Sequence, residues 1–208
     1  MRKKTSFRVT TLLVAVLLVS ACSPRARYEH RLKKELAGGV RHDSLFQGLY
    51  LGMHSKDFFL HCWKLNQQGL IRQGPNNQTV EYKIKEELKY PATMLYYPQF
   101  FEDKIYEMPV RISYDGWTPW NKELSSDNLL KDVLHWFEKK YGKGFIKVVH
   151  PDHGPAYVKI DGNRRITIFK ENELYVWAVF TDMSVKKSSG SFLPGTGDLG
   201  DAGNENNK

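Results

Sequence analysis

The sequence predicts an α+β fold in which an antiparallel sheet carries two main helices on one face. Two segments place apolar residues at helical spacing between matching start and stop residues. The segments after each helix alternate apolar and polar residues, as half-buried strands do. Short turn sequences separate those strands, which favours antiparallel pairing. The helix-then-strands order occurs twice in the 208 residues, which suggests a helix-then-meander pseudo-repeat.

Both predicted helices use the same signals. The first begins at Ser55 as N-cap, carries Asp57 in its first turn and stops at Gly69. The second begins near Ser126 and stops at Gly142. The apolar face of the first helix consists of Phe58, Phe59, Cys62 and Leu65. The stripe of the second consists of Leu129, Leu130, Val133, Leu134, Phe137 and Tyr141.

Six strands are predicted, over residues 79–86, 104–114, 145–149, 156–160, 164–169 and 174–181. Pro109 lacks a backbone donor, so it indicates an edge strand or a bulge. Asp161-Gly162-Asn163 is a strong hairpin turn, and Glu171-Asn172 is a second turn.

The N-terminus has the three parts of a bacterial secretion signal. Met1-Arg2-Lys3-Lys4 is basic, residues 12–19 are apolar, and Ser20-Ala21 are small. The apolar run is shorter than the roughly 20 residues of a spanning helix. Cys22 follows directly, so the site resembles a bacterial lipobox. The alternative is an ordinary cleaved signal with an incidental cysteine.

The lipobox resemblance implies a thioether-linked diacylglycerol on Cys22 and hence a membrane anchor. Ser23 follows in place of Asp, which under the enteric sorting rule implies the outer membrane, and the lack of an acidic stretch after it favours the periplasmic face. We therefore expect a signal peptide over 1–21 and a basic tether over 22–43, which is interpreted as a flexible spacer, with a partly helical segment around Tyr28 to Leu36 as the alternative. A single domain over 44–185 and a disordered tail over 186–208 follow.

The formal charge of +8 is concentrated near the N-terminus. Residues 44–185 hold eighteen basic and seventeen acidic side chains, so the folded body is nearly neutral. A broad basic footprint for nucleic acid is therefore absent, and no nucleic-acid partner is expected.

A second resemblance begins at Phe46-Gln47-Gly48-Leu49-Tyr50-Leu51-Gly52-Met53, which a capped helix follows. This looks like the opening of small outer-membrane lipoproteins of the BamE/SmpA-like and β-lactamase-inhibitor-like group. The chain as a whole also resembles lipoproteins of Bacteroidales. The resemblance implies helices on an antiparallel sheet and a function in binding proteins rather than in catalysis.

Few residues indicate chemistry. Cys62 lies in a helical stripe and is expected to be a buried small hydrophobe. His150-Pro151-Asp152-His153 supplies only part of a metal site, and its prolines and glycine favour a solvated turn, so no metal and no cofactor are expected. No Gly-x-Ser-x-Gly motif, phosphate loop or HExxH motif is present, and no enzyme is predicted. A hydrolase whose residues come together only in the fold is a third alternative.

An aromatic loop, Tyr114-Asp115-Gly116-Trp117-Thr118-Pro119-Trp120, joins a strand to the second helix. Trp117 and Trp120 either stack on a ligand or fold back over the core. Two functions follow. The first is a lipid-anchored envelope protein that binds a protein partner or supports an assembly. The alternative is a lipoprotein that binds a glycan or small ligand through Trp117 and Trp120.

Overall fold

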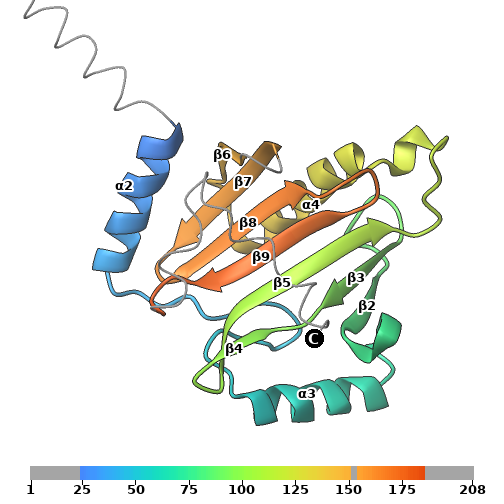
Figure 1. The fold of residues 1–208 in the computed structure, drawn as a ribbon, viewed down its shortest axis with the longest axis horizontal. Coiled ribbons are helices and arrows are strands. Elements are labelled where there is room, and N and C mark those ends of the chain that lie inside the picture. The colour runs from blue at the N-terminus through green and yellow to red at the C-terminus, as the bar shows by residue number, and fades with distance from the viewer. Residues whose placement is uncertain (1–23, 151–153, 186–208) are drawn as a thin grey trace, which may run out of the picture.

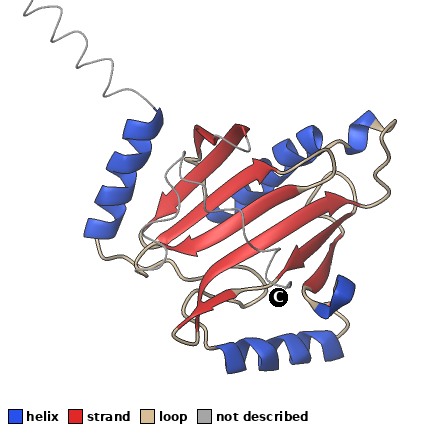
Figure 2. Cartoon of the chain, in the orientation of Figure 1, coloured by secondary structure: helices blue, strands red, loops and turns tan. Residues whose placement is uncertain are grey.

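The computed structural model describes residues 24–150 and 154–185, which form an α+β fold (Figures 1 and 2). Nine strands of the described residues make one antiparallel sheet in the order β1-β2-β3-β5-β9-β8-β7-β6, with β4 paired to β5. In the same part of the chain three α-helices accompany it, namely α2 (Pro24–Ala37), α3 (Ser55–Gln67) and α4 (Ser126–Tyr141). The predicted fold class is confirmed.

The strands match most of the predicted segments. They are β1 (Arg72–Gln73), β2 (Val80–Ile84), β3 (Ala92–Tyr96), β4 (Gln99–Phe101), β5 (Lys104–Tyr114), β6 (Ile146–His150), β7 (Gly154–Asp161), β8 (Arg164–Lys170) and β9 (Val176–Asp182). The short strands β1 and β4, together with β3, were not predicted. Two short 3-10 helices, η1 (Pro75–Asn77) and η2 (Lys122–Leu124), lie in loops.

The helix-then-meander order does occur twice. α3 precedes β1 to β5, and α4 precedes β6 to β9. The last strands of the two halves, β5 and β9, pair at the centre of the sheet from Glu107↔Thr181 to Ile112↔Val176. Among the described strands, the edges of the sheet are therefore β1–β2 at one end and β6 at the other.

The main core lies between the sheet and α4, which packs behind the sheet in the view of Figure 1. Leu129, Val133 and Phe137 of α4 are buried there. Phe58 of α3 belongs to the same cluster. The loop that carries the resemblance motif also packs into this core, through Leu45, Phe46, Leu49, Leu51 and Met53.

Segment 24–37 is not a flexible spacer, which corrects the expectation for the tether. It forms α2, and α2 packs on β6 and β7 through the buried Tyr28 and the partly buried Leu32. Adjacent strand residues face opposite sides of a sheet. Val158 of β7, which contacts α2, pairs with Thr167, whereas Ile166 and Ile168 of β8 face α4. α2 therefore covers the face opposite α4.

The chain from 35 to 43 is fastened to the β7–β8 turn. The backbone N–H of Gly162 donates to Glu35 Oε2 at 2.9 Å, and the N–H of His42 donates to Asn163 Oδ1 at 2.7 Å. Arg41 Nη2 donates to Asp43 and, 2.9 Å away, to the buried carboxylate of Asp182. We call residues 24–43 the N-terminal arm, and these contacts make it part of the folded body.

Pro109 lies in the central strand β5, so the edge strand predicted from it is wrong. The alternative, a bulge, is closer, because the β4–β5 register shifts between Gln99 and Phe100. The pairing explains why this proline is tolerated. On one side β3 ends at Tyr96↔Val110 and β4 begins at Gln99↔Glu107, so neither pairs with Pro109. Only β9 pairs with it, through Val179. Proline has no backbone N–H, and on the side of β3 and β4 no described strand pairs with Pro109. The missing donor therefore costs no hydrogen bond between strands.

The predicted signal at 1–21, Cys22 and the tail 186–208 lie outside the described residues. Among the residues that are described, no helix is long and apolar enough to cross a membrane.

Candidate functional site

Helix α3 presents apolar residues outward as well as inward. Phe58 is buried and meets Tyr97 and Phe100 edge to face at ring-centroid distances of 6.0 and 6.1 Å. On the outer side Phe59, Leu60 and Trp63 are 51%, 49% and 60% exposed. We call these three residues the α3 apolar surface. Phe59 was expected on the inner face, so its exposure is a correction to the predicted stripe.

The start of α3 is fixed differently from the prediction. His54, not Ser55, is the N-cap, and its side chain makes no cap bond. Ser55 Oγ instead donates to Asp103 in the β4–β5 turn, and its backbone N–H donates to Asp103 O at 3.0 Å. The hydrogen bond from Ser55 and contact with His54 lower the pKa of the Asp103 carboxyl. α3 is thus joined rigidly to the sheet.

His54, Ser55 and Asp103 are the residue types of a hydrolase triad, but the hydrogen bonds among them differ from those of a triad. His54 Nδ1 lies 3.1 Å from Asp103 Oδ2, and the serine also meets that carboxylate. In a triad the serine bonds to the histidine, which the carboxylate orients from behind. The arrangement therefore fixes a helix start rather than activating the hydroxyl.

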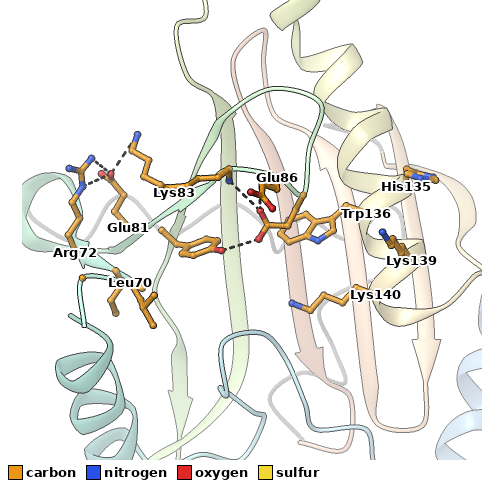
Figure 3. A pocket seen from close by; sticks show the side chains of 14 residues that line it. Leu70, Arg72, Glu81, Lys83, Glu86, His135, Trp136, Lys139 and Lys140 are labelled. Atoms are coloured by element: carbon orange, nitrogen blue, oxygen red, sulfur yellow. Dashed lines mark hydrogen bonds and ion pairs between the residues drawn. The ribbon is translucent and has the colours of Figure 1, made fainter. Parts of the chain in front are cut away.

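A groove of about 1050 Å³ lies between the β2 edge of the sheet and α4 (Figure 3). We call it the β2–α4 groove. It is lined by Leu70 and Ile71, which follow α3, and by Tyr82 and Lys83 of β2. The far wall belongs to α4 and to the loop after β2, with the side chains of Lys85, Glu86, Glu87, His135, Trp136, Lys139 and Lys140.

Most acidic groups around the groove are already engaged. Glu81 accepts from Arg72 Nε at 2.7 Å. Glu87 accepts from Tyr82 OH at 2.9 Å and from the backbone N–H groups of Lys85 and Glu86. Partial burial alone would raise the pKa of Glu87, but these hydrogen bonds outweigh it and lower that pKa. Burial, and then the bond to Glu87, raise the pKa of Tyr82 to about 12.

The lysines of this wall, unlike Glu81, make no ion pair in the part of the chain that the structure describes. Within the described residues, Lys85, Lys139 and Lys140 have no carboxylate at ion-pair distance. Lys140 Nζ lies 5.8 Å from the centre of the Trp136 ring (Figure 3). Although much of Lys140 is exposed, partial burial of its ammonium group lowers its pKa. The groove therefore has more positive than negative charge, and Lys85, Lys139 and Lys140 make no ion pair there within the described residues.

The two tryptophans of the aromatic loop do not converge. Trp117 is partly buried and lines a pocket of about 450 Å³ with Asp127 and Glu173. Trp120 is 81% exposed and does not line that pocket. Trp117 thus lies beside a small pocket, whereas the side chain of Trp120 is directed into solvent.

Cys62 packs against the main core. It is half-buried, whereas a buried small hydrophobe was expected at this position. Burial raises the pKa of its thiol to about 11. A thiol must lose its proton to act as a nucleophile, so Cys62 is poorly suited to nucleophilic chemistry at neutral pH.

This leads to a prediction for the chain without Cys22, residues 23–208, which we call the lipid-free chain and in which Cys62 is the only cysteine. A rise from 9.0 to about 11 lowers the thiolate fraction about 100-fold at pH 8. Reaction with Ellman's reagent should be slower by that factor than in guanidinium, and should accelerate as pH rises toward 11. Equal rates in the folded and unfolded chain would contradict the burial of Cys62.

His150-Pro151-Asp152-His153 falls largely outside the described residues. In the part of the chain that is described, no group of three or more His, Cys, Asp or Glu side chains lies close enough to hold a metal ion.

The sequence predicted neither the α3 apolar surface nor the β2–α4 groove. One signal was present: Phe58-Phe59-Leu60 and Trp63 spread apolar residues around more than one side of the helix. The groove has no such signal, because it is formed by segments about 50 residues apart. Comparison with protein-family models, with curated proteins and with solved structures gave no match.

Proposed function

We propose that this protein is a lipid-anchored envelope protein that binds a protein partner and has no enzymatic activity of its own. The observation that carries the proposal is the α3 apolar surface. Three large apolar side chains, each about half exposed, stand together on a helix that is fixed at its start. Contiguous exposed apolar surface marks interaction sites, and aromatic residues supply most of the binding energy at such sites.

The position of the proposed anchor favours a protein over the membrane as the occupant of this surface. Two Cα–Cα steps separate Cys22 from Pro24, which is about 7 Å at full extension. α2 begins at the upper left of Figure 1, whereas α3 lies along the bottom. A lipid on Cys22 would hold the start of α2 at the membrane, and α3 would lie away from that point. We infer the outer membrane and its periplasmic face from the signal sequence, as set out above.

The proposal predicts that Phe59→Asp/Trp63→Asp abolishes partner capture. Two charges placed in the centre of the apolar surface would have to be buried on binding, which is costly. The measurement is quantitative capture from detergent-solubilised envelope, with the Cys22-lipidated protein as bait. We expect at least a tenfold loss of the co-purifying partner. The melting temperature of the variant should stay within a few degrees of the parent, because both side chains are exposed.

Trp120→Asp/Val149→Asp is the matched control. It makes the same change from an apolar side chain to a carboxylate at two exposed positions outside α3, with the same change in net charge. The control should retain most of the capture. Equal capture by both variants, or no stoichiometric partner in any bait, would contradict the proposal.

A second candidate function rests on the exposure of Trp120 and on the pocket beside Trp117. Aromatic rings on an exposed loop stack on sugars. If the protein binds a glycan, Trp117→Ala/Trp120→Ala should abolish binding to envelope glycans without unfolding the chain. Unchanged glycan binding by this variant would remove the second candidate.

A further inference from the structure

The end of the sheet next to the β2–α4 groove is only partly covered. β1 pairs with two residues of β2, in the register Arg72↔Glu81 and Gln73↔Val80. On its inner side β2 pairs with β3 along its whole length, to Ile84↔Ala92. Within the described residues, Tyr82, Lys83 and Ile84 therefore have no strand on their outer side. Unpaired strand edges are templates for an added strand.

The groove provides space and apolar contact beside this open edge. Its volume is about 1050 Å³, and it extends from the residues after α3 to α4. Leu70 and Trp136 supply apolar surface at its two ends (Figure 3). An extended segment rises about 3.3 Å per residue, so the three open residues of β2 match a segment of about three to five residues.

The charges of the groove determine which kind of extended segment binds there most favourably. Lys85, Lys139 and Lys140 lie around it without carboxylate partners, while Glu81 and Glu87 are held by Arg72 and Tyr82. Glu86 is the one remaining acid among the lining residues. The charge available to an incoming segment is therefore positive, which favours a segment with Asp or Glu side chains.

We propose that the β2–α4 groove receives an extended, acidic segment of the protein partner, which adds as a strand to the open edge of β2 while its carboxylates meet Lys139 and Lys140. This inference rests on the proposed function, since it names how the partner is recognised. Leu70, which lines the groove, is the third residue after the end of α3, so one partner can contact the groove and the α3 apolar surface together.

The test uses a library of random dodecapeptides displayed on phage and selected on the lipid-free chain. We expect the selected peptides to be rich in Asp or Glu between β-branched or aromatic residues. They should bind Lys139→Glu/Lys140→Glu at least tenfold more weakly than the parent chain. Lys122→Glu/Lys131→Glu changes the net charge equally outside the groove and should bind them normally.

Hydrogen exchange locates the bound peptide. A synthetic copy of a selected peptide should slow exchange at Tyr82–Ile84 and leave β6, at the opposite edge of the sheet, unchanged. No enrichment, enrichment without acidic residues, equal binding to Lys139→Glu/Lys140→Glu, or protection at β6 would each overturn the inference.

Partner capture separates this inference from the proposed function. If Phe59→Asp/Trp63→Asp abolishes capture and Lys139→Glu/Lys140→Glu leaves it intact, the protein binds a partner but the groove does not take part. If peptides are selected at the groove but no partner is captured from the envelope, the strand-addition site stands and the proposed partner binding at α3 fails.

Discussion

Replacing Phe180 with alanine should lower the free energy of unfolding by about 3–5 kcal/mol, the range for a buried phenylalanine. Phe180 is fully buried in the central strand β9. Its ring lies 5.9, 5.7 and 5.3 Å from the rings of Phe46, Phe137 and Tyr141, measured between centroids. It therefore joins the sheet, α4 and the loop before α3, and its removal leaves a cavity that all three border.

The measurement is urea unfolding of the lipid-free chain, followed by far-UV circular dichroism. Val149→Ala on the edge strand β6 is the control, because that side chain is exposed, and its effect should stay within about 0.5 kcal/mol. A loss below 1 kcal/mol for Phe180→Ala would mean that the main core is not packed as described.

Replacing Gly162 with alanine should release the N-terminal arm from the body. Gly162 has φ of +53°, in the left-handed region that favours glycine. A Cβ atom there would lie 2.0 Å from the carbonyl oxygen of Val40, which is backbone and cannot move aside without undocking the arm. We expect α2 to lose its protection from hydrogen exchange by at least tenfold, while the central strands β5 and β9 keep theirs.

Gly116→Ala is the control that distinguishes the clash with Val40 from the strain of placing alanine at a positive φ. Gly116 has φ of +73°, so alanine is strained there too, but a Cβ atom would meet nothing within 4 Å. This variant should lose about 1 kcal/mol in overall stability and keep α2 fully protected. Equal protection of α2 in both variants would show that the contact between Gly162 and Val40 does not hold the arm.

Local patterns predicted those parts of the fold whose partners lie nearby in the sequence. The alternation of Lys104–Tyr114 and the spacing within Ser126–Tyr141 correspond to the observed β5 and α4. Gly162-Asn163 forms the two-residue turn between β7 and β8, as predicted. Asn172 Oδ1 accepts from the N–H groups of Leu174 and Tyr175, which closes the second predicted turn.

The features that sequence patterns missed depend on distant contacts. α2 is polar apart from a few residues, so its helix is stabilised by Tyr28 and Leu32 against strands more than 100 residues away. Strand β3 alternates correctly, but Pro91 and Pro98 flank it, and Tyr96-Tyr97 has the composition of a packed loop. Lys139 and Lys140 have the ordinary composition of a helix end, and only the position of β2 makes them the wall of a groove.

The docking of the N-terminal arm on the β7–β8 turn also sets an order of events in time. His42 and Asn163 are 121 residues apart in sequence, and Arg41 and Asp182 are 141 apart. The arm is the first described segment to be synthesised, yet its binding site exists only after almost the whole sheet has been made. Docking of the arm therefore has to wait for the strands that carry Asn163 and Asp182, whereas the helix α2 itself needs only neighbouring residues for its backbone hydrogen bonds.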